Sequence, residues 1–365
     1  MEEQFRGARK TNVNCGTSGN GSGINEAIEN GYTDITISGI CRENLNYTIW
    51  RDPASDGYRP SGKLAPRYLK ISGESSNSKI VDASSNSQNT ISVSSNTTLF
   101  LENITISGGK YAVTASRNSN LLISNITVEN FSERGLQVDD SSYLGVDEGE
   151  LTIKGAAGAD RGIHLATGSS GWIENMTVSG VKYGLYMFKS GVFMNGTIVN
   201  GAERGFVLDL GTQLTIYGED KPVNITNSIK SGVTVWGKSH LTLSDSTSLN
   251  ISGGENGIEI GEFSSAISGG EIVIKETSDN AIRITGGGIS NWKGTISIMN
   301  SNGNDAINAD QAQLNLQNIE ISDNLFIAGL SFYRSTGDFN NLNFNEAKIG
   351  MRQSNINISN SNVTG

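Results

Sequence analysis

A five-residue motif recurs along most of this chain and restricts its fold more than any other feature. In each copy a Gly or Ala follows a leading residue and precedes an apolar, a variable and an apolar residue, as in Arg134-Gly135-Leu136-Gln137-Val138. The copies fall 21 to 27 residues apart. A period of this length indicates a solenoid in which each repeat buries its apolar side chains only against its neighbours. We predict one inward ladder made of Leu136, Ile163, Leu185, Phe206, Val233, Ile258, Ile282, Ile307 and Leu330.

Two further alternating strands accompany many copies of the motif. For example, Leu99-Phe100-Leu101 precedes Asn103-Ile104-Thr105-Ile106. Alternation with a period of two directs one side chain inward and the next outward. Three short strands per repeat predict an all-β protein, a right-handed parallel β-helix that is a single-stranded solenoid of about twelve coils. A leucine-rich repeat would need a helical half-repeat, and a propeller would need about 40 residues per blade, so neither fits.

The abundant Asn and Gly residues are assigned to the turns between these strands. Asn tolerates a left-handed backbone, and its amide can form ladders between coils. The Asn-x-Thr triplets at Asn103, Asn125 and Asn175 are therefore interpreted as turn chemistry rather than as glycosylation sites.

The chain divides into three parts. Residues 1–50 are expected to hold an N-terminal cap and the first coil, and residues 51–67 a loop insertion with three of the four prolines. Residues 68–365 hold the β-helix coils, which we expect to continue beyond the C-terminus. The segment from Ser22 to Glu29 has an apolar face and predicts a short helix that covers the open end of the first coil.

The two cysteines, Cys15 and Cys41, flank this helix and the strand after it. A disulfide between them would join the two ends of this segment and would suit an oxidising compartment. Two buried free thiols are the alternative, and two cysteines carry too little information to decide between them.

Charge and hydropathy exclude several classes of partner. The net charge is −10, the pI is near 4.9, and Lys and Arg form no run, which disfavours nucleic-acid binding. No apolar run is long enough for membrane insertion. The N-terminus does not resemble a signal peptide. We therefore expect an extracellular protein whose signal has been removed, or a virion-associated one.

The opening of the chain resembles that of the pectin-lyase-like β-helix superfamily, and the resemblance covers essentially the whole chain. It rests on Val13-Asn14-Cys15, the helical segment, the strand Ile35-Thr36-Ile37-Ser38-Gly39 and Cys41-Arg42-Glu43-Asn44. Members of that superfamily include polysaccharide lyases, glycoside hydrolases, epimerases, phage tailspikes and non-catalytic adhesins, so the resemblance implies a fold more than an activity. Of the polygalacturonase signatures only Asp139-Asp140 is present. The calcium-binding acids of pectate lyases are not identifiable, and we expect no metal and no cofactor.

The outward face of the motif strands carries the candidate site. Aromatic rings stack on sugar rings, and arginines contact hydroxyls and carboxylates. The predicted substrate-binding residues are Arg134, Arg161, Tyr183, Tyr186, Phe188, Arg204 and Trp236. Glycoside cleavage uses paired carboxylates, and a lyase needs a base. The predicted catalytic residues are Asp139, Asp140, Asp209 and His164.

Structural interpretations of the same residues remain open. The three arginines follow Glu133, Asp160 and Glu203 and could balance charge along a solvated edge, while His164 could be an incidental exposed histidine. Our functional hypothesis is a phage tailspike-like or secreted depolymerase that recognises a cell-surface or matrix polysaccharide and could cleave it as a lyase or glycoside hydrolase. The tailspike interpretation also allows a homotrimer. The alternative is a structural or adhesive β-helix without catalysis.

Overall fold

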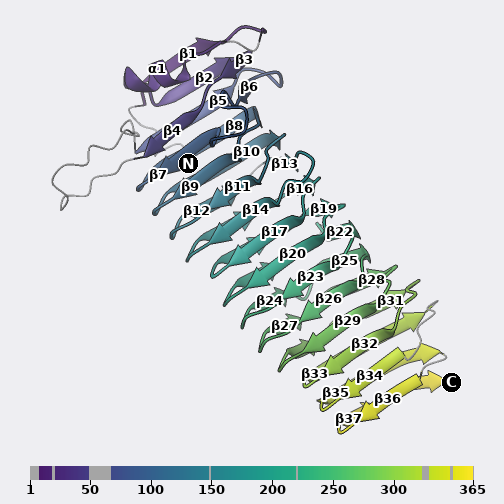
Figure 1. Cartoon of the computed structure of the whole chain (residues 1–365). Helices are drawn as coiled ribbons and strands as arrows, with labels where there is room; N and C mark the ends of the chain where they lie inside the picture. Colours follow the sequence, from purple (N-terminus) through teal and green to yellow (C-terminus); the bar gives the residue numbers. More distant parts are fainter. Residues whose placement is uncertain are drawn as a thin grey trace. The chain divides into compact units, whose positions relative to one another are not determined.

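A computed structural model describes the chain at residues 8–18, 21–48, 67–147, 149–218, 221–322, 329–345 and 348–364 (Figure 1). The expected insertion at 51–67 lies outside these ranges except for its last residue. The chain forms two compact units, Met1–Val181 and Lys182–Gly365, which we call the first and second unit and describe separately.

The described residues form an all-β parallel β-solenoid of about 13 turns, close to the twelve coils expected. Every turn adds one strand to sheet B, the sheet of the recurrent motif, and most turns add two shorter strands or one bent strand to sheet A. All strand pairings within each unit are parallel, as in Arg134↔Arg161 of sheet B.

Sheet B is built from the motif strands. In the first unit they are β4 (Leu45–Thr48), β7 (Ile91–Ser94), β9 (Tyr111–Ser116), β11 (Arg134–Val138) and β14 (Arg161–Ala166). In the second unit they are β17 (Tyr183–Phe188), β20 (Arg204–Asp209), β23 (Ser231–Val235), β26 (Asn256–Ile260), β29 (Asn280–Thr285), β32 (Asp305–Asp310), β34 (Gly329–Tyr333) and β36 (Lys348–Arg352).

Sheet A holds the remaining strands. In the first unit they are β1 (Lys10–Asn14), β2 (Asp34–Ser38), β3 (Ile40–Arg42), β5 (Tyr68–Gly73), β6 (Lys79–Val81), β8 (Thr98–Ser107), β10 (Asn120–Glu129), β12 (Tyr143–Val146), β13 (Leu151–Lys154), β15 (Ser170–Ile173) and β16 (Met176–Ser179). In the second unit they are β18 (Gly191–Met194), β19 (Ile198–Asn200), β21 (Gln213–Ile216), β22 (Val223–Ser228), β24 (His240–Leu243), β25 (Ser248–Gly253), β27 (Ser265–Ser268), β28 (Glu271–Lys275), β30 (Ile289–Trp292), β31 (Ile296–Met299), β33 (Gln313–Ser322), β35 (Thr336–Asn345), β37 (Asn355–Ser359) and β38 (Asn362–Thr364).

The predicted inward ladder is confirmed in each unit. Leu136 pairs with Ile163 in the first unit. In the second unit Leu185 pairs with Phe206, and the column runs on through the expected residues to Leu330. All of these side chains are fully buried. Stacking identical positions of successive coils thus removes apolar surface from water that no single coil could cover.

Asparagine turns join the paired segments of sheet A, as predicted. The three Asn-x-Thr residues Asn103, Asn125 and Asn175 have φ of 54°, 52° and 52°, the left-handed region. Asn125 donates from Nδ2 to Oδ1 of Asn103 at 3.1 Å, so the side chains form a ladder between turns. The structural interpretation of these triplets is therefore confirmed.

The N-terminal segment contains the only helix among the described residues, α1 (Ile24–Glu29), two residues shorter at its start than expected. Its buried face consists of Ile24, Ala27 and Ile28, and it contacts β1 and β2 (Figure 1). Closure of the first coil by this helix stays a prediction. Cys15 and Cys41 form a disulfide, which decides between the two alternatives left open by the sequence.

Candidate functional site

The outward face of sheet B in the first unit carries a hydrogen-bonded chain of polar side chains. Arg134 donates from Nη1 to Oε1 of Gln137 at 2.6 Å, and Gln137 donates from Nε2 to Oδ2 of Asp139. The guanidinium of Arg134 lies 4.9 Å from the ring centre of Tyr111, and in the sheet register Arg134 is next to Arg161. Two arginines, an amide and a carboxylate therefore meet on neighbouring strands.

His164 lies beside Gln137 in this register but is buried, with 8% of its surface exposed. The expectation of an exposed histidine was wrong, because the side chains on adjacent strands cover the imidazole. Burial, together with the nearby charges of Arg161 and Arg134, lowers the pKa of His164 to about 3. His164 is therefore neutral at pH 7 and a weak base.

Burial raises the pKa of Asp139 above its ordinary value, although the nearby charges of Arg134 and Arg161 oppose this shift. Asp139 is half-buried, and the hydrogen bond from Gln137 opposes the rise of its pKa as well. Its Oδ1 is buried and accepts no hydrogen bond from the described residues. Asp140 is exposed in the following turn with φ of 53°, and its charge raises the pKa of Asp139.

In the second unit the outward face is organised by Glu259 on β26. Arg204 on β20 lies 3.2 Å from Oε2 of Glu259, and Arg283 on β29 lies 3.3 Å from Oε1. Arg204 also donates to Oγ of Ser231 and to Oγ1 of Thr234, at 3.2 and 2.9 Å. The side chains of Arg204 and Glu259 are only 18% and 11% exposed, so this ion pair is screened by solvent much less than a surface pair.

Trp236 lies at the edge of this network, directly after β23. Its ring centre is 5.4 Å from the guanidinium carbon of Arg204, a cation–π distance. A Cβ on Gly261 would lie 3.3 Å from Cδ1 of Trp236, so the indole covers a glycine of the next turn. Trp236 is half-buried, so part of the residue is accessible to solvent.

The tyrosines of β17 also lie in this region. Tyr186 donates its hydroxyl to Oδ2 of Asp209 at 3.2 Å, and the rings of Tyr183 and Tyr186 meet edge to face at 5.7 Å between centres. Phe188 pairs with Asp209 in the register and is half-buried. The second unit thus brings together six of the predicted residues: Tyr183, Tyr186, Phe188, Arg204, Asp209 and Trp236.

Local charge balance explains one of the three arginines. Arg161 Nε lies 3.2 Å from the preceding acid, Asp160. The other two preceding acids pair with lysines: Glu133 with Lys110 at 3.4 Å and Glu203 with Lys230 at 2.6 Å. Arg134 and Arg204 therefore bond within the outward face itself, to Gln137 and to Glu259.

Sequence reasoning missed Glu259 and Gln137 as members of the site. Both belong to the outward column that contains His164 and Tyr186, and Glu259 is the one carboxylate of that column. This was the available signal, since a lone acid among outward residues is the natural partner of arginines on adjacent coils. The proposed acid–base pair of Asp139 and Asp209 is divided between the two units, and their joint action stays a prediction.

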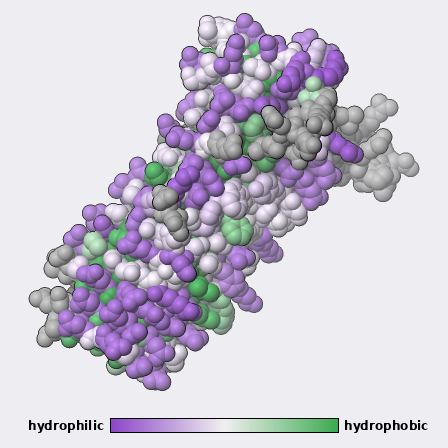
Figure 2. All heavy atoms as spheres, turned by 180° about the vertical axis from the view of Figure 1, so that it is seen from behind, coloured by the Kyte–Doolittle hydropathy of each residue, from purple (hydrophilic) through white to green (hydrophobic). Residues whose placement is uncertain are grey.

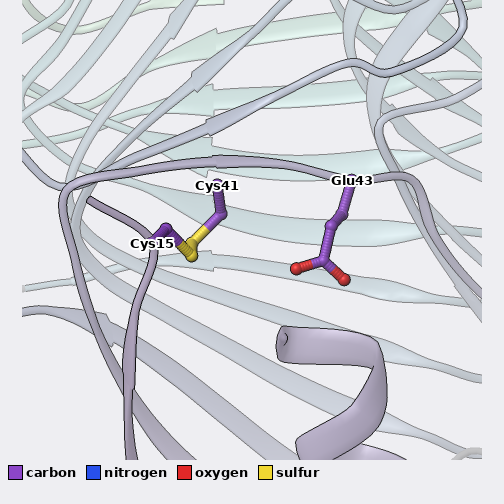
Figure 3. A group of neighbouring side chains, drawn as sticks. All are labelled: Cys15, Cys41 and Glu43. Carbon is purple, nitrogen blue, oxygen red and sulfur yellow. A yellow bond between two sulfur atoms is a disulfide. The ribbon is translucent and has the colours of Figure 1, made fainter. Parts of the chain in front are cut away.

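A metal site can be tested at the N-terminal end, where Cys15, Cys41 and Glu43 lie close together (Figure 3). The two sulfur atoms are bonded to each other. The carboxylate of Glu43 accepts the backbone N–H groups of Gly23, Ile24 and Asn25 and the amide of Asn25, at 2.6 to 3.0 Å. Disulfide-bonded sulfur atoms are not thiolates and cannot serve as metal ligands. The carboxylate oxygens of Glu43 already accept hydrogen bonds from the first residues of α1 and from the residue before it. These three residues therefore do not fit a metal site.

No protein-family model matches the chain, and no curated protein matches it. Within the described residues, no helix combines the length and apolar content needed to cross a membrane. The candidate site consequently has to be interpreted from its own geometry.

Proposed function

We propose that the outward face of sheet B recognises a polysaccharide of a cell surface or matrix. The observation that carries the proposal is the environment of Trp236. A partly exposed indole lies beside hydrogen-bonding groups fixed in position by the Arg204–Glu259 pair. Sugar rings present an apolar C–H face and a rim of hydroxyls, and this combination of aromatic and charged groups complements both.

The physical context supports the same proposal. Figure 2, which shows the molecule from behind relative to Figure 1, displays mostly hydrophilic residues with small, separate hydrophobic patches on that side. We infer a right-handed, pectin-lyase-like helix, since crossovers between parallel strands are right-handed in about 98% of cases. An extracellular or virion-associated protein, as a homotrimer in the tailspike case, accords with the disulfide and the acidic charge.

Binding of the intact protein to an array of neutral and acidic glycans tests recognition. Trp236→Ala and Tyr186→Ala should each weaken binding by about 1 to 3 kcal/mol, roughly 5- to 150-fold in Kd, as buried aromatic anchors do. Ile229→Ala is the control, because Ile229 is an exposed apolar residue of the same unit outside the site. Unchanged affinity in both aromatic variants would remove this face as the binding surface.

Cleavage is a second candidate function, favoured by the raised pKa of Asp139. A half-buried carboxyl group whose pKa is raised by burial has one of the properties of a general acid that protonates a leaving glycosidic oxygen. The polysaccharides that bind should be incubated with the protein while new reducing ends and unsaturated uronates are followed. Asp139→Asn should abolish turnover and leave binding intact. An absence of turnover in the wild-type protein would favour the adhesive alternative.

A further inference from the structure

The second unit contains a groove that lies outside the predicted site residues. It has a volume of about 750 Å³ and runs along the turns that follow β20, β23, β26, β29 and β32. Hydrogen bonds join these turns to one another: the N–H of Lys238 donates to the carbonyl of Glu262 at 3.1 Å, and the N–H of Phe263 to that of Gly286 at 3.1 Å. Five turns at about 4.8 Å spacing extend about 19 Å.

Two large apolar residues of the groove lie at turn positions whose backbone conformation favours glycine. Each turn from β20 to β29 has two successive residues in the left-handed region, and the neighbouring turns place Gly at one or both positions, as Gly286 and Gly287 do. Leu210 and Phe263 stand at such positions, with φ of 51° and 60°. Large side chains are disfavoured there, at a cost of about 1 kcal/mol or more each.

Burial does not explain these two side chains either. Leu210 is 45% exposed and Phe263 is 70% exposed. A Cβ on Gly287 would come within 2.6 Å of the Phe263 ring, so the ring contacts this glycine while most of the residue stays exposed. Strained, exposed apolar groups that contribute little to the core indicate a binding role.

The polar lining indicates the chemistry of the occupant. Lys238 and Glu262 bring opposite charges to adjacent turns, and Gln311 adds a neutral amide. This set offers hydrogen bonds without a net charge to neutralise. Trp236 and Gly261 directly precede the groove residues Gly237 and Glu262 in the sequence, so the groove begins next to the candidate site. An occupant must therefore be long, uncharged, rich in hydroxyl groups and apolar on its ring faces.

We propose that this groove binds a run of uncharged sugar residues, with Phe263 and Leu210 against the ring faces and Lys238, Glu262 and Gln311 on the hydroxyls. This proposal rests on the proposed function. It adds that the uncharged portion of the polysaccharide binds to the turns. It also extends the proposed binding surface to the turns beyond Glu259.

The test uses Phe263→Gly and Leu210→Gly, because neighbouring turns already accept glycine at both positions. Glycine relieves the left-handed strain, which offsets the greater freedom that it gives the unfolded chain, so the urea midpoint of each variant should equal or exceed that of the wild-type protein. The affinity for uncharged glycans of the array should fall by tenfold or more in each variant. Ile229→Ala should change neither quantity. Simultaneous gain of stability and loss of affinity is a result that a purely structural role would not produce.

The failures of the two proposals are distinguishable. Unchanged glycan affinity in Phe263→Gly, with weakened binding in Trp236→Ala, overturns the groove and leaves recognition by sheet B intact. Absence of any glycan binding by the wild-type protein overturns both. A change of oligomeric state in Phe263→Gly, measured by sedimentation velocity without a change in glycan affinity, would instead make the groove a contact between copies and overturn its assignment to sugars.

Discussion

Replacement of His164 tests the electrostatics of the first unit most directly. The imidazole is buried and its pKa is lowered from 6.5 to about 3. At pH 7 it is neutral in both the folded and the unfolded chain and contributes nothing to pH dependence. As the pH falls below 6.5, His164 becomes protonated in the unfolded chain but stays neutral in the folded chain. The free energy of unfolding therefore decreases between pH 6.5 and about pH 3.

The magnitude follows from the shift. One pKa unit corresponds to 1.36 kcal/mol, and pH 4 lies 2.5 units below the unfolded value, so His164 should reduce the free energy of unfolding by about 3 kcal/mol between pH 7 and pH 4. His164→Gln removes this titration and keeps a polar side chain. Its stability should therefore fall with acidification by about 3 kcal/mol less than that of the wild-type protein.

Urea unfolding at pH 7 and pH 4 measures this difference, since carboxylates titrate in both proteins and largely cancel. The chain has two histidines, and the exposed His240 provides the control: His240→Gln should keep the full acid sensitivity. In that variant an NMR titration reports His164 alone. A pKa near 6.5, or equal acid sensitivity in His164→Gln and wild type, would refute the burial argument.

Two further predictions concern stability. The double variant Cys15→Ser, Cys41→Ser opens the disulfide-closed loop, whose ends are 26 residues apart in the sequence. The chain-entropy relation predicts that its free energy of unfolding falls by about 3.5 kcal/mol. Urea titration measures this loss, and an unshifted urea midpoint would contradict the prediction. Glu259→Gln leaves Arg204 without its carboxylate partner and should destabilise the second unit by about 1.5 to 3 kcal/mol, at low and at high salt. If high salt removed this difference in stability between variant and wild type, the ion pair would not be shielded from solvent.

The solenoid could be predicted because its determinants are local and repeated. A strand such as β10 alternates buried and outward side chains on either side of Asn125, and the same pattern recurs on the next coil. Repetition then fixes the register, so that Leu136 must stack on Ile163. The disulfide stayed undecided because pairing depends on proximity in space, which two isolated cysteines do not encode.

The burial of His164 and Glu259 could not be predicted from the same pattern. Alternation gives the direction in which a side chain leaves the strand, but not how neighbouring long side chains fold over it. Arg204 on β20 reaches past β23 to Glu259 on β26, a choice of rotamer and partner that the repeat does not specify. Phe263 was missed for another reason: it lies in a turn, where a period of two assigns no direction.

The outward residues of the second unit therefore form two sets, one on the strands of sheet B and one on the turns that follow them. The two sets differ in how readily they can bind a ligand. On the strands, Arg204 and Arg283 satisfy Glu259, so a ligand that competed for these groups would have to replace hydrogen bonds that already exist. On the turns, the side chains of Leu210 and Phe263 are exposed. Their backbone is in the left-handed conformation, which is unfavourable for large side chains. Binding energy is more readily gained at the second set, because a ligand there covers apolar surface without breaking an internal pair. Trp236 lies at the boundary of the two, and a chain of sugars that stacks on it could extend over the turns as well as over the strands.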